Sequence, residues 1–412
     1  MRIPYNCLIC KGRDCKKYCG DENCPTCQRF KTIFSSKKLV DSDNFSGFSP
    51  TPFVGRFNYP RINVGILSTP QASYDREDYD NPRGWAAQGF SLHQLVDIRS
   101  SLLNANFQSH ILNARKQDKL LELSQDIAIA KRPVDVEIRL TERPKFNIDF
   151  DAQAAPRGPT GHLKDAEATS NPNAVARMQK VTDDIDLKAA DAINYLYKHG
   201  IEENQISRSL SVGVMGLKKN RKLTPTRWSI TAIDDTIGKS LVEGLITLQH
   251  ADPCFYFGGI LGNYYLIILL PGIFGYELFE MYVPDSKITP VFSTDHETFR
   301  GRKQYAYQTA GGYYTVRLAI AEKLTQLKRQ ATVLAFRFIT DEYKAPLGVW
   351  VTREATRTAL DNPPNSFSSD DIMMQFSEAF VKKKFGIDIS SILKASVFYC
   401  ARKQQTTLDS YS

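Results

Sequence analysis

Cysteine is nearly absent from most of this 412-residue chain: beyond residue 27 the sequence contains only Cys254 and Cys400. The other six cysteines lie within the first 27 residues, so they indicate one local site. The segment before them, Met1 to Asn6, lacks the apolar stretch of a secretory signal, and disulfides persist mainly in oxidising compartments. We therefore expect reduced thiols and an intracellular, cytoplasmic protein.

The sequence also lacks the common motifs of hydrolases and nucleotide-binding enzymes. Its six histidines are scattered without an H-E-x-x-H pattern, and no G-x-S-x-G sequence is present. Gly238-Lys239-Ser240 resembles the end of a P-loop, but Ile233 stands where that motif requires a glycine. No reaction is indicated, and whether the protein is an enzyme is left open.

One long uncharged run, residues 253–276, is long enough to cross a bilayer. Five glycines, Asn263 and Pro271 interrupt it, which argues against a membrane span. Gly262-Asn263 lies between two aromatic and β-branched runs, a pattern typical of a turn that joins two buried strands. The sequence therefore predicts a protein without a membrane-spanning segment.

The overall composition is that of a globular protein, with 42% hydrophobic and 24% charged residues. This excludes a disordered, collagen-like or coiled-coil chain. The length predicts two or three domains with a buried core. The 53 basic residues exceed the 45 acidic ones, and this net charge of +8 favours a polyanionic partner.

The order of the patterns predicts an α+β fold with an irregular mixed α/β core and a small N-terminal zinc module. Alternation predicts strands at 62–67 and 134–140, and apolar runs predict strands at 228–232 and 331–339. Helices are predicted near 116–131, 184–199, 314–330 and 370–384, and Ser91 with Gln94 has the spacing of a capping box. The predicted domains are the zinc module at 1–30, a linker at 31–60, α+β domains at 61–155 and 156–400, and a flexible tail at 401–412.

The six clustered cysteines follow the spacing C-x2-C-x4-C-x3-C-x4-C-x2-C. Each C-x2-C pair lets two sulfur atoms approach one tetrahedral ion, so Cys7 and Cys10 with Cys24 and Cys27 predict a zinc site. Cys15 and Cys19 are then surplus, or the four ligands are drawn differently from the six. Four thiolates close the coordination shell, so the zinc is expected to be structural.

The C-terminal residues Gln405, Leu408 and Tyr411 have the spacing Q-x-x-L-x-x-aromatic. On a single turn, the leucine and the tyrosine would fill a hydrophobic pocket while the glutamine binds at its rim. This resembles the interaction box for the sliding clamp PCNA. The usual box ends in two aromatic residues, and Ser412 in the second place is expected to weaken the contact.

Two segments carry residues suited to nucleic acid or a nucleotide. Cations crowd the first, next to an aromatic that either stacks on a base or packs in the core: Lys218, Lys219, Arg221, Lys222, Arg227 and Trp228. Nearby Asp234 and Asp235 either bind a metal or cap a helix. The second segment surrounds Gly311-Gly312 with Arg302, Tyr313 and Arg317, at a predicted helix start that favours an anion.

Several unusual strings resemble the archaeal Nre family of DNA-repair proteins over nearly the whole chain. They are the cysteine module with its CKG, CG and CP elements, PFVGRFNYPRINVGILS, TPTRWSITAIDD, GGYYTVRLAIAE, PLGVWVTRE and the terminal box. The resemblance implies a repair factor that docks on the clamp, and metal ligands at Cys7, Cys10, Cys19 and Cys24. This set differs from the double C-x2-C set, and both stay open. The loop APRGPTGH departs from the Gly-Pro-Ser-Gly-Pro run of the family.

Two functions therefore compete. The first is a non-membrane DNA-repair factor that binds DNA or nucleotides through basic and aromatic surfaces and is recruited to PCNA by its tail. The second is an enzyme acting on damaged DNA or a nucleotide in a pocket lined by segments 221–239 and 302–322.

Overall fold

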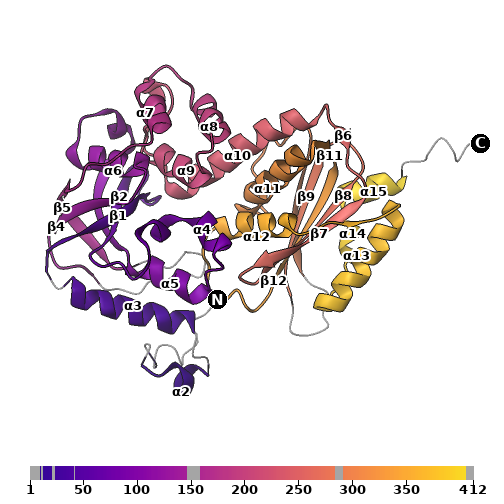
Figure 1. The fold of residues 1–412 in the computed structure, drawn as a ribbon, viewed down its shortest axis with the longest axis horizontal. Helices are drawn as coiled ribbons and strands as arrows, with labels where there is room; N and C mark the ends of the chain where they lie inside the picture. The colour runs from indigo at the N-terminus through magenta and orange to yellow at the C-terminus, as the bar shows by residue number, and fades with distance from the viewer. Residues whose placement is uncertain are drawn as a thin grey trace, which may run out of the picture. The chain divides into compact units, whose positions relative to one another are not determined.

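A computed structural model of the chain describes residue 10 and residues 13–20, 24–40, 42–145, 158–283 and 291–404. The chain divides into two compact units (Figure 1): unit 1 comprises Met1–Thr236 with Lys344–Gly348, and unit 2 comprises Ile237–Tyr343 with Val349–Ser412. The boundary falls within helix α10 (Thr226–Leu245). The mixture of helices with mixed sheets confirms the predicted α+β class.

Unit 1 is built around a closed five-stranded barrel in the order β1–β2–β3–β5–β4. Its strands are β1 (Asn44–Val54), β2 (Arg61–Thr69), β3 (Leu103–His110), β4 (Val134–Leu140) and β5 (Thr160–Ala168). Neighbouring strands are antiparallel except β3 and β5, which are parallel. Strand β1 pairs with two neighbours: its first half pairs with β4 and its second half with β2. A side chain at Gly47 would meet the Thr69 carbonyl, so glycine allows this close approach.

The barrel strands show the alternation expected of a sheet with one buried face. On β2, the side chains of Ile62, Val64 and Ile66 are fully buried, while Arg61 and Asn63 are exposed. Helix α6 (Lys119–Ile129) lies between β3 and β4 in the chain and packs Leu123 and Ile127 into the barrel core. The strands predicted at 62–67 and 134–140 and the helix predicted near 116–131 are confirmed.

Besides α6 and the start of α10, the described part of unit 1 contains seven α-helices and three short 3₁₀ helices. They are α2 (Cys15–Cys19), α3 (Pro25–Leu39), α4 (Pro82–Ala87), α5 (Leu92–Ser101), α7 (Ala176–Asp183), α8 (Ala189–Lys198) and α9 (Glu203–Ser211), with the short 3₁₀ helices η1 (Arg76–Asp80), η2 (Ile111–Arg115) and η3 (Lys218–Asn220). The predicted capping box of α5 is confirmed, since the Gln94 N–H donates to Ser91 Oγ and the Ser91 N–H donates to Gln94 Oε1.

Residues 31–60 are not a linker, contrary to the expectation from their composition. They contain most of α3 and all of β1, the strand that closes the barrel. Several of the serines and prolines that suggested a linker, with Gly47, are accommodated in a bent strand, where Ser49, Pro50 and Thr51 are buried. Strand β5 completes the same barrel, so residues on both sides of the predicted boundary at 155 and 156 belong to unit 1.

Unit 2 contains a six-stranded sheet in the order β10–β9–β12–β8–β7–β13. Its strands are β7 (Cys254–Ile260), β8 (Asn263–Leu270), β9 (Gly275–Tyr282), β10 (Phe292–Thr298), β12 (Thr332–Ile339) and β13 (Asn365–Ser366), and β6 (Gln249–His250) pairs separately with β11 (Arg329–Gln330). Only β9 and β12 run parallel in the larger sheet. The strand predicted at 331–339 is confirmed as β12.

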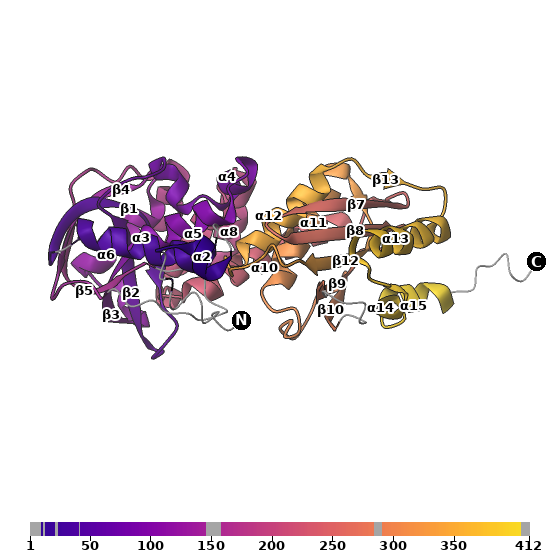
Figure 2. The same ribbon diagram turned by 90° about the horizontal axis from the view of Figure 1, so that it is seen from below.

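Helices cover both faces of the unit 2 sheet, so its central strands are apolar on both sides. One face packs against α11 (Gly312–Leu327) and α12 (Trp350–Asp361), and the other against α13 (Asp370–Phe385), α14 (Ser390–Leu393) and α15 (Val397–Gln404) (Figure 2). Alternate residues of β8 divide between the two cores, with Ile267 in the first and Ile268 in the second.

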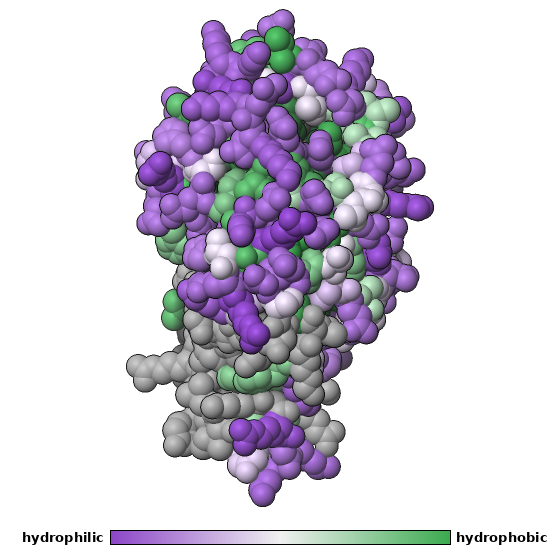
Figure 3. Space-filling model, turned by 90° about the vertical axis from the view of Figure 1, so that its left-hand side faces the viewer, coloured by the Kyte–Doolittle hydropathy of each residue, from purple (hydrophilic) through white to green (hydrophobic). Residues whose placement is uncertain are grey.

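The long uncharged run forms two paired strands, as predicted. Strands β7 and β8 are antiparallel neighbours joined at Leu261 and Gly262, which both have a positive φ. Among the described residues, none of the helices has the length and apolar character needed to cross a membrane. Viewed from the side of the barrel (Figure 3), the surface is largely hydrophilic, and apolar side chains form only interrupted areas.

The strand predicted at 228–232 is wrong, because these residues form the first turns of α10. Its β-branched residues suggested a strand, but Ile233, Ile237 and Leu245 are buried at helical spacing. Asp234 and Asp235 accordingly lie inside the helix and do not cap it. Asp234 is fully buried.

Candidate nucleic-acid interface and metal centre

Three segments of unit 1 meet beside the barrel. The loop between β1 and β2 accepts a hydrogen bond from the Ile111 N–H at the Pro60 carbonyl, 3.1 Å away. Ile111 in turn accepts from the Leu223 N–H at 2.9 Å, and Thr226 Oγ1 accepts from the Val54 N–H at 2.9 Å. We call the exposed side chains of segments 55–61, 111–116 and 217–228 the hairpin patch.

Three exposed aromatic side chains stand in the hairpin patch. Phe57 is 70% exposed, Tyr59 is 46% exposed and Trp228 is 47% exposed. The rings of Tyr59 and Trp228 lie 5.6 Å apart between centroids and are tilted by 48°. Trp228 is therefore not a core residue. Of the two interpretations of its sequence, packing in the core is wrong.

The hairpin patch is strongly basic. Its three segments contain no aspartate or glutamate. Eight of their cationic residues are exposed: Arg56, Arg61, Arg115, Lys116, Lys218, Lys219, Lys222 and Arg227. Exposed cations beside aromatic faces are the groups that bind phosphates and stack on bases in nucleic-acid complexes.

Arg221 is only partly exposed, unlike the eight exposed cations, and its whole guanidinium binds the protein itself. Its Nε donates to the Gly216 carbonyl at 2.8 Å, and its Nη atoms donate to the carbonyls of Thr182 and Asp184 at 2.8 and 2.9 Å. Of the exposed cations, Arg115 donates its Nε to the Arg221 carbonyl at 2.6 Å. Partial burial lowers the pKa of Arg221 from its ordinary value. The Arg221 side chain fastens the segment that carries the other cations.

The cysteines form the second candidate site. Cys10 and Cys27 are fully buried, Cys15 is nearly so, and Cys19 and Cys24 pack against them. Cys15 and Cys19 are at opposite ends of α2, which the Asp14 side chain caps at Lys17 N and which ends at Gly20 with a φ of 68°. Cys27 is in the first turn of α3.

The sulfur atoms fall into two groups that share Cys27. Those of Cys10, Cys15 and Cys27 lie within 4.8 Å of one another, as do those of Cys19, Cys24 and Cys27. In a tetrahedral zinc site with bonds of about 2.3 Å, sulfur atoms are about 3.8 Å apart. The cluster therefore fits a metal ion, and Cys27 is its common member.

Neither predicted set of four ligands is decided by these groups. Cys7 belongs to both sets and lies outside the described residues. Cys15, which looked surplus in the sequence, lies inside the cluster. Burial raises the pKa of the Cys27 thiol, and its hydrogen bond with Cys19 raises it further. A bound cation would oppose this and favour the thiolate.

The predicted binding residues of unit 2 are not displayed at its surface. Tyr313 is fully buried, and its ring lies 4.8 Å from that of Tyr276. Arg317 is 1% exposed, and its Nη1 binds the buried Glu297 carboxylate at 3.0 and 3.2 Å. Both side chains project from α11 into the unit, so the predicted ligand contacts are not available to them.

Arg302 is also occupied within unit 2. Its Nη2 is 2.9 Å from Asp295 Oδ1, and its Nη1 donates to the His296 carbonyl at 2.7 Å. Asp295 also accepts from the backbone N–H groups of Gln308 and Thr309. These contacts shape the loop before α11.

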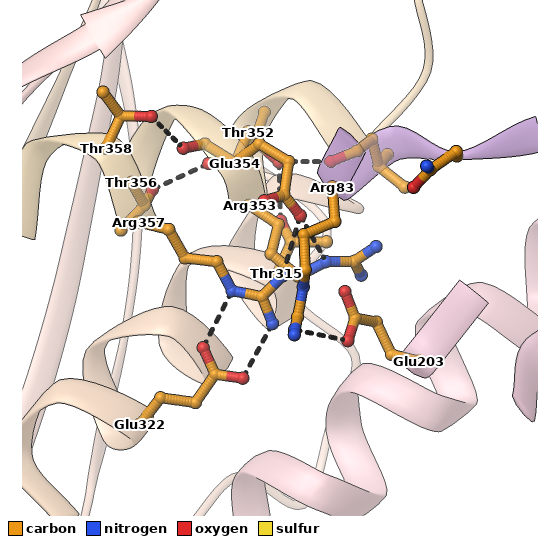
Figure 4. Close-up of polar contacts among 12 residues, drawn as sticks. Arg83, Glu203, Thr315, Glu322, Thr352, Arg353, Glu354, Thr356, Arg357 and Thr358 are labelled. Carbon is orange, nitrogen blue, oxygen red and sulfur yellow. Dashed lines mark hydrogen bonds and ion pairs between the residues drawn. The ribbon is translucent and has the colours of Figure 1, made fainter. Parts of the chain in front are cut away.

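A second polar cluster of unit 2 joins α11 to α12 (Figure 4). Arg357 binds both oxygens of Glu322, at 2.7 and 2.9 Å, and donates to Glu354 Oε1 at 2.7 Å. The hydroxyl oxygens of Thr315 and Thr352 are 2.6 Å apart in the same helix pair. These hydrogen bonds pair the buried polar groups between two packed helices. The cluster therefore has a structural role, which is to hold α11 against α12.

The proposed clamp-binding residues Gln405, Leu408 and Tyr411 lie outside the described residues. The chain that precedes them is fixed at helix α15. Glu277, fully buried on β9, accepts hydrogen bonds from Ser396 Oγ at 2.6 Å and from the Val397 N–H at 3.1 Å. This carboxylate holds the start of the helix that ends at Gln404.

Comparison with known proteins settles the family. The family model for the N-terminal part of archaeal Nre matches residues 18–289, and the model for its C-terminal part matches residues 297–411. The chain belongs to the archaeal Nre family. The Haloferax volcanii protein named DNA repair protein NreA is 36% identical over 79% of this chain and 80% of its own length.

Two further Nre relatives come from Archaeoglobus fulgidus. DNA repair protein NreA is 31% identical over 96% of this chain and 99% of its own length. DNA repair protein NreB is 30% identical over 97% of this chain and 98% of its own length. No solved structure matches the chain significantly.

The hairpin patch joins two of the strings that carry the Nre resemblance. PFVGRFNYPRINVGILS supplies Phe57, Tyr59 and the cations beside them, and TPTRWSITAIDD supplies Arg227 and Trp228. Arg56, Phe57, Tyr59 and Arg61 were not among the predicted binding residues. The sequence could have indicated them, because Phe57 and Tyr59 lie in a turn between Gly55 and Pro60. Aromatic side chains in a turn cannot pack into a core as those of a buried strand do.

Proposed function

We propose that this chain is a DNA-repair factor that binds DNA through the hairpin patch and is recruited to the PCNA sliding clamp by its C-terminal peptide. Three relatives named as DNA repair proteins support the repair role. The hairpin patch carries the DNA-binding proposal, because it combines exposed cations, exposed aromatics and no carboxylate. We also propose that the protein is cytoplasmic.

The clamp contact is proposed from the sequence of the tail. In the sequence, the peptide that contains Gln405, Leu408 and Tyr411 follows directly after α15. A short peptide with a leucine and an aromatic anchor gains affinity by burying both in one pocket. Recruitment would place the hairpin patch near DNA that the clamp encircles.

We also propose that the cysteine cluster holds zinc. The ligands are drawn from Cys7, Cys10, Cys19, Cys24 and Cys27, with Cys15 as an additional donor inside the cluster. A zinc ion bound by four thiolates stabilises the fold around it and offers no open position for catalysis. Its role would be to order the chain before α3.

The alternative of an enzyme using Tyr313 and Arg317 loses support because both side chains are buried. A nucleotide ligand could still be bound by the hairpin patch, since its groups suit one nucleotide as well as a strand.

The proposal is tested by measuring DNA binding of the full chain by fluorescence anisotropy. The variant Lys222→Ala/Arg227→Ala removes two exposed cations of the hairpin patch, and Lys382→Ala/Lys383→Ala on α13 is the matched control. We expect the first variant alone to weaken binding. If both variants bind like the parent chain, the hairpin patch is not the DNA site.

A further inference from the structure

The barrel of unit 1 has the connectivity of an OB-fold. It is a five-stranded Greek-key barrel in which β1 pairs with β2 and β4, β3 runs parallel to β5, and α6 connects β3 to β4. Barrels of this type bind oligonucleotides or oligosaccharides on the outer surface of strands 2 and 3 and with the loop between strands 1 and 2. Here that loop is residues 55–60, the centre of the hairpin patch.

The outer surface of β2 and β3 continues the hairpin patch with uncharged hydrogen-bonding groups. Because Ile62, Val64 and Ile66 face the core, the alternate residues face outward. In register, Arg61 is opposite His110, Asn63 is opposite Gln108, Gly65 is opposite Asn106 and Leu67 is opposite Asn104. None of these eight residues is acidic.

Gly65, in the middle of this outer surface, leaves space for a neighbouring side chain. A side chain there would meet Asn104 Oδ1 at 1.8 Å, so the amide of Asn104 lies across the glycine. Phe53 on β1 is the register partner of Gly65 and is partly exposed on the same face. Asn63 and Gln108 are exposed on this face, whereas Gly65 and Asn106 are buried. The exposed part therefore presents two amides and the partly exposed ring of Phe53 beside the aromatic tip of the loop.

These groups suit bases that are free of a duplex. In duplex DNA the base faces are stacked on each other, so an aromatic side chain can reach only phosphates, sugars and groove edges. Aromatic side chains stack on the bases of single strands, and amides bind the base edges that pairing would otherwise occupy. Carbohydrate is disfavoured as the ligand because the eight exposed cations match a polyanion.

We propose that the hairpin patch and the outer surface of β2 and β3 form one site for single-stranded DNA. Bases stack on Tyr59, Trp228 and Phe57, while the exposed cations bind the phosphates. This inference rests on the proposed DNA binding and specifies the form of the DNA.

The test compares single-stranded and duplex DNA on the full chain. A labelled oligonucleotide of about 16 nucleotides covers the range of single OB-folds, and its duplex is the competitor form. We expect the single strand to bind at least about ten-fold tighter than the duplex at equal salt, because each stacked base is worth a factor of this order.

Variants of the aromatic residues separate stacking from charge. Trp228→Ala and Tyr59→Ala should each weaken single-strand binding about ten-fold or more and leave duplex binding within about two-fold. Trp228→Phe should retain most of the affinity, which shows that the alanine variant fails through stacking rather than misfolding. Tyr282→Ala, which removes a 71% exposed tyrosine of unit 2, is the matched control.

The outcomes distinguish the single-strand site from DNA binding in general and from RNA binding. Equal affinity for both forms, or equal losses on both, overturns the single-strand site but leaves DNA binding by the hairpin patch in place. Binding of neither form overturns this inference and the proposed function together. Tighter binding of RNA of the same sequence overturns the assignment to DNA.

Discussion

The salt dependence of DNA binding should report the cations of the hairpin patch. Each phosphate neutralised by a cation releases counterions, and the slope of log affinity against log salt is about −0.7 per contact for single strands and about −0.9 for duplex DNA. If all eight exposed cations contact a single strand, the slope reaches about −5.6. Raising salt from about 50 to about 200 mM would then weaken binding by up to roughly 2,000-fold.

The variant Lys222→Ala/Arg227→Ala should reduce this slope by a defined amount. Two lost contacts remove about 1.4 from the slope on a single strand and about 1.8 on duplex DNA. Between the same two salt concentrations, the loss of single-strand affinity should therefore be about seven-fold smaller than for the parent chain. Both residues are exposed, so we expect the free energy of unfolding to change by less than about 0.5 kcal/mol each.

The assay is a series of anisotropy titrations of the full chain at four or more salt concentrations. The control Lys382→Ala/Lys383→Ala removes the same charge from α13 and should leave the slope unchanged. A parent slope near zero would refute phosphate binding by the hairpin patch. Equal reductions in the two double variants would show that net charge, rather than this surface, controls binding.

Two remaining predictions concern the ends of the chain. Elemental analysis should find one zinc per chain. The variant Cys27→Ser should lose most of this zinc, because the Cys27 thiol belongs to both sulfur groups. The control Cys254→Ser should retain the zinc, because Cys254 lies outside the cluster and burial raises the pKa of its thiol to about 11. Full zinc in Cys27→Ser, or iron in place of zinc, would contradict the assigned site. Deleting residues 405–412 should abolish co-elution with purified PCNA while the circular dichroism spectrum is retained; co-elution of the shortened chain would contradict the tail assignment.

Much of the secondary structure follows from local patterns. The alternation of residues 134–140 and the Gly262 turn identified strands correctly, because burial on one or two faces leaves a direct trace in the sequence. The segment 228–232 was predicted wrongly because β-branched residues there outweighed the helical spacing of Ile233 and Ile237. The bent strand β1 is not predicted because one glycine and two prolines interrupt its apolar pattern.

The candidate sites were predictable only where the residues are close in sequence. The cysteine cluster lies within one short segment, and its spacing alone indicated a metal. The hairpin patch joins residues near 57 to residues near 228, which tertiary contacts bring together: the hydrogen bonds through Ile111, the bond from Val54 to Thr226 and the ring contact of Tyr59 with Trp228. Arg317 and Arg227 look alike in sequence, but one is buried against Glu297 and the other is exposed. Tertiary burial makes that difference, and local sequence does not encode it.

The emission of Trp228 offers the most direct test that DNA binds at the hairpin patch. The chain has three tryptophans, and Trp85 and Trp350 are buried while Trp228 is 47% exposed. We predict that titrating DNA into the full chain quenches tryptophan fluorescence, and that Trp228→Phe abolishes this quenching while anisotropy still reports binding. Unchanged Trp228 emission on DNA that anisotropy shows to be bound would contradict the account.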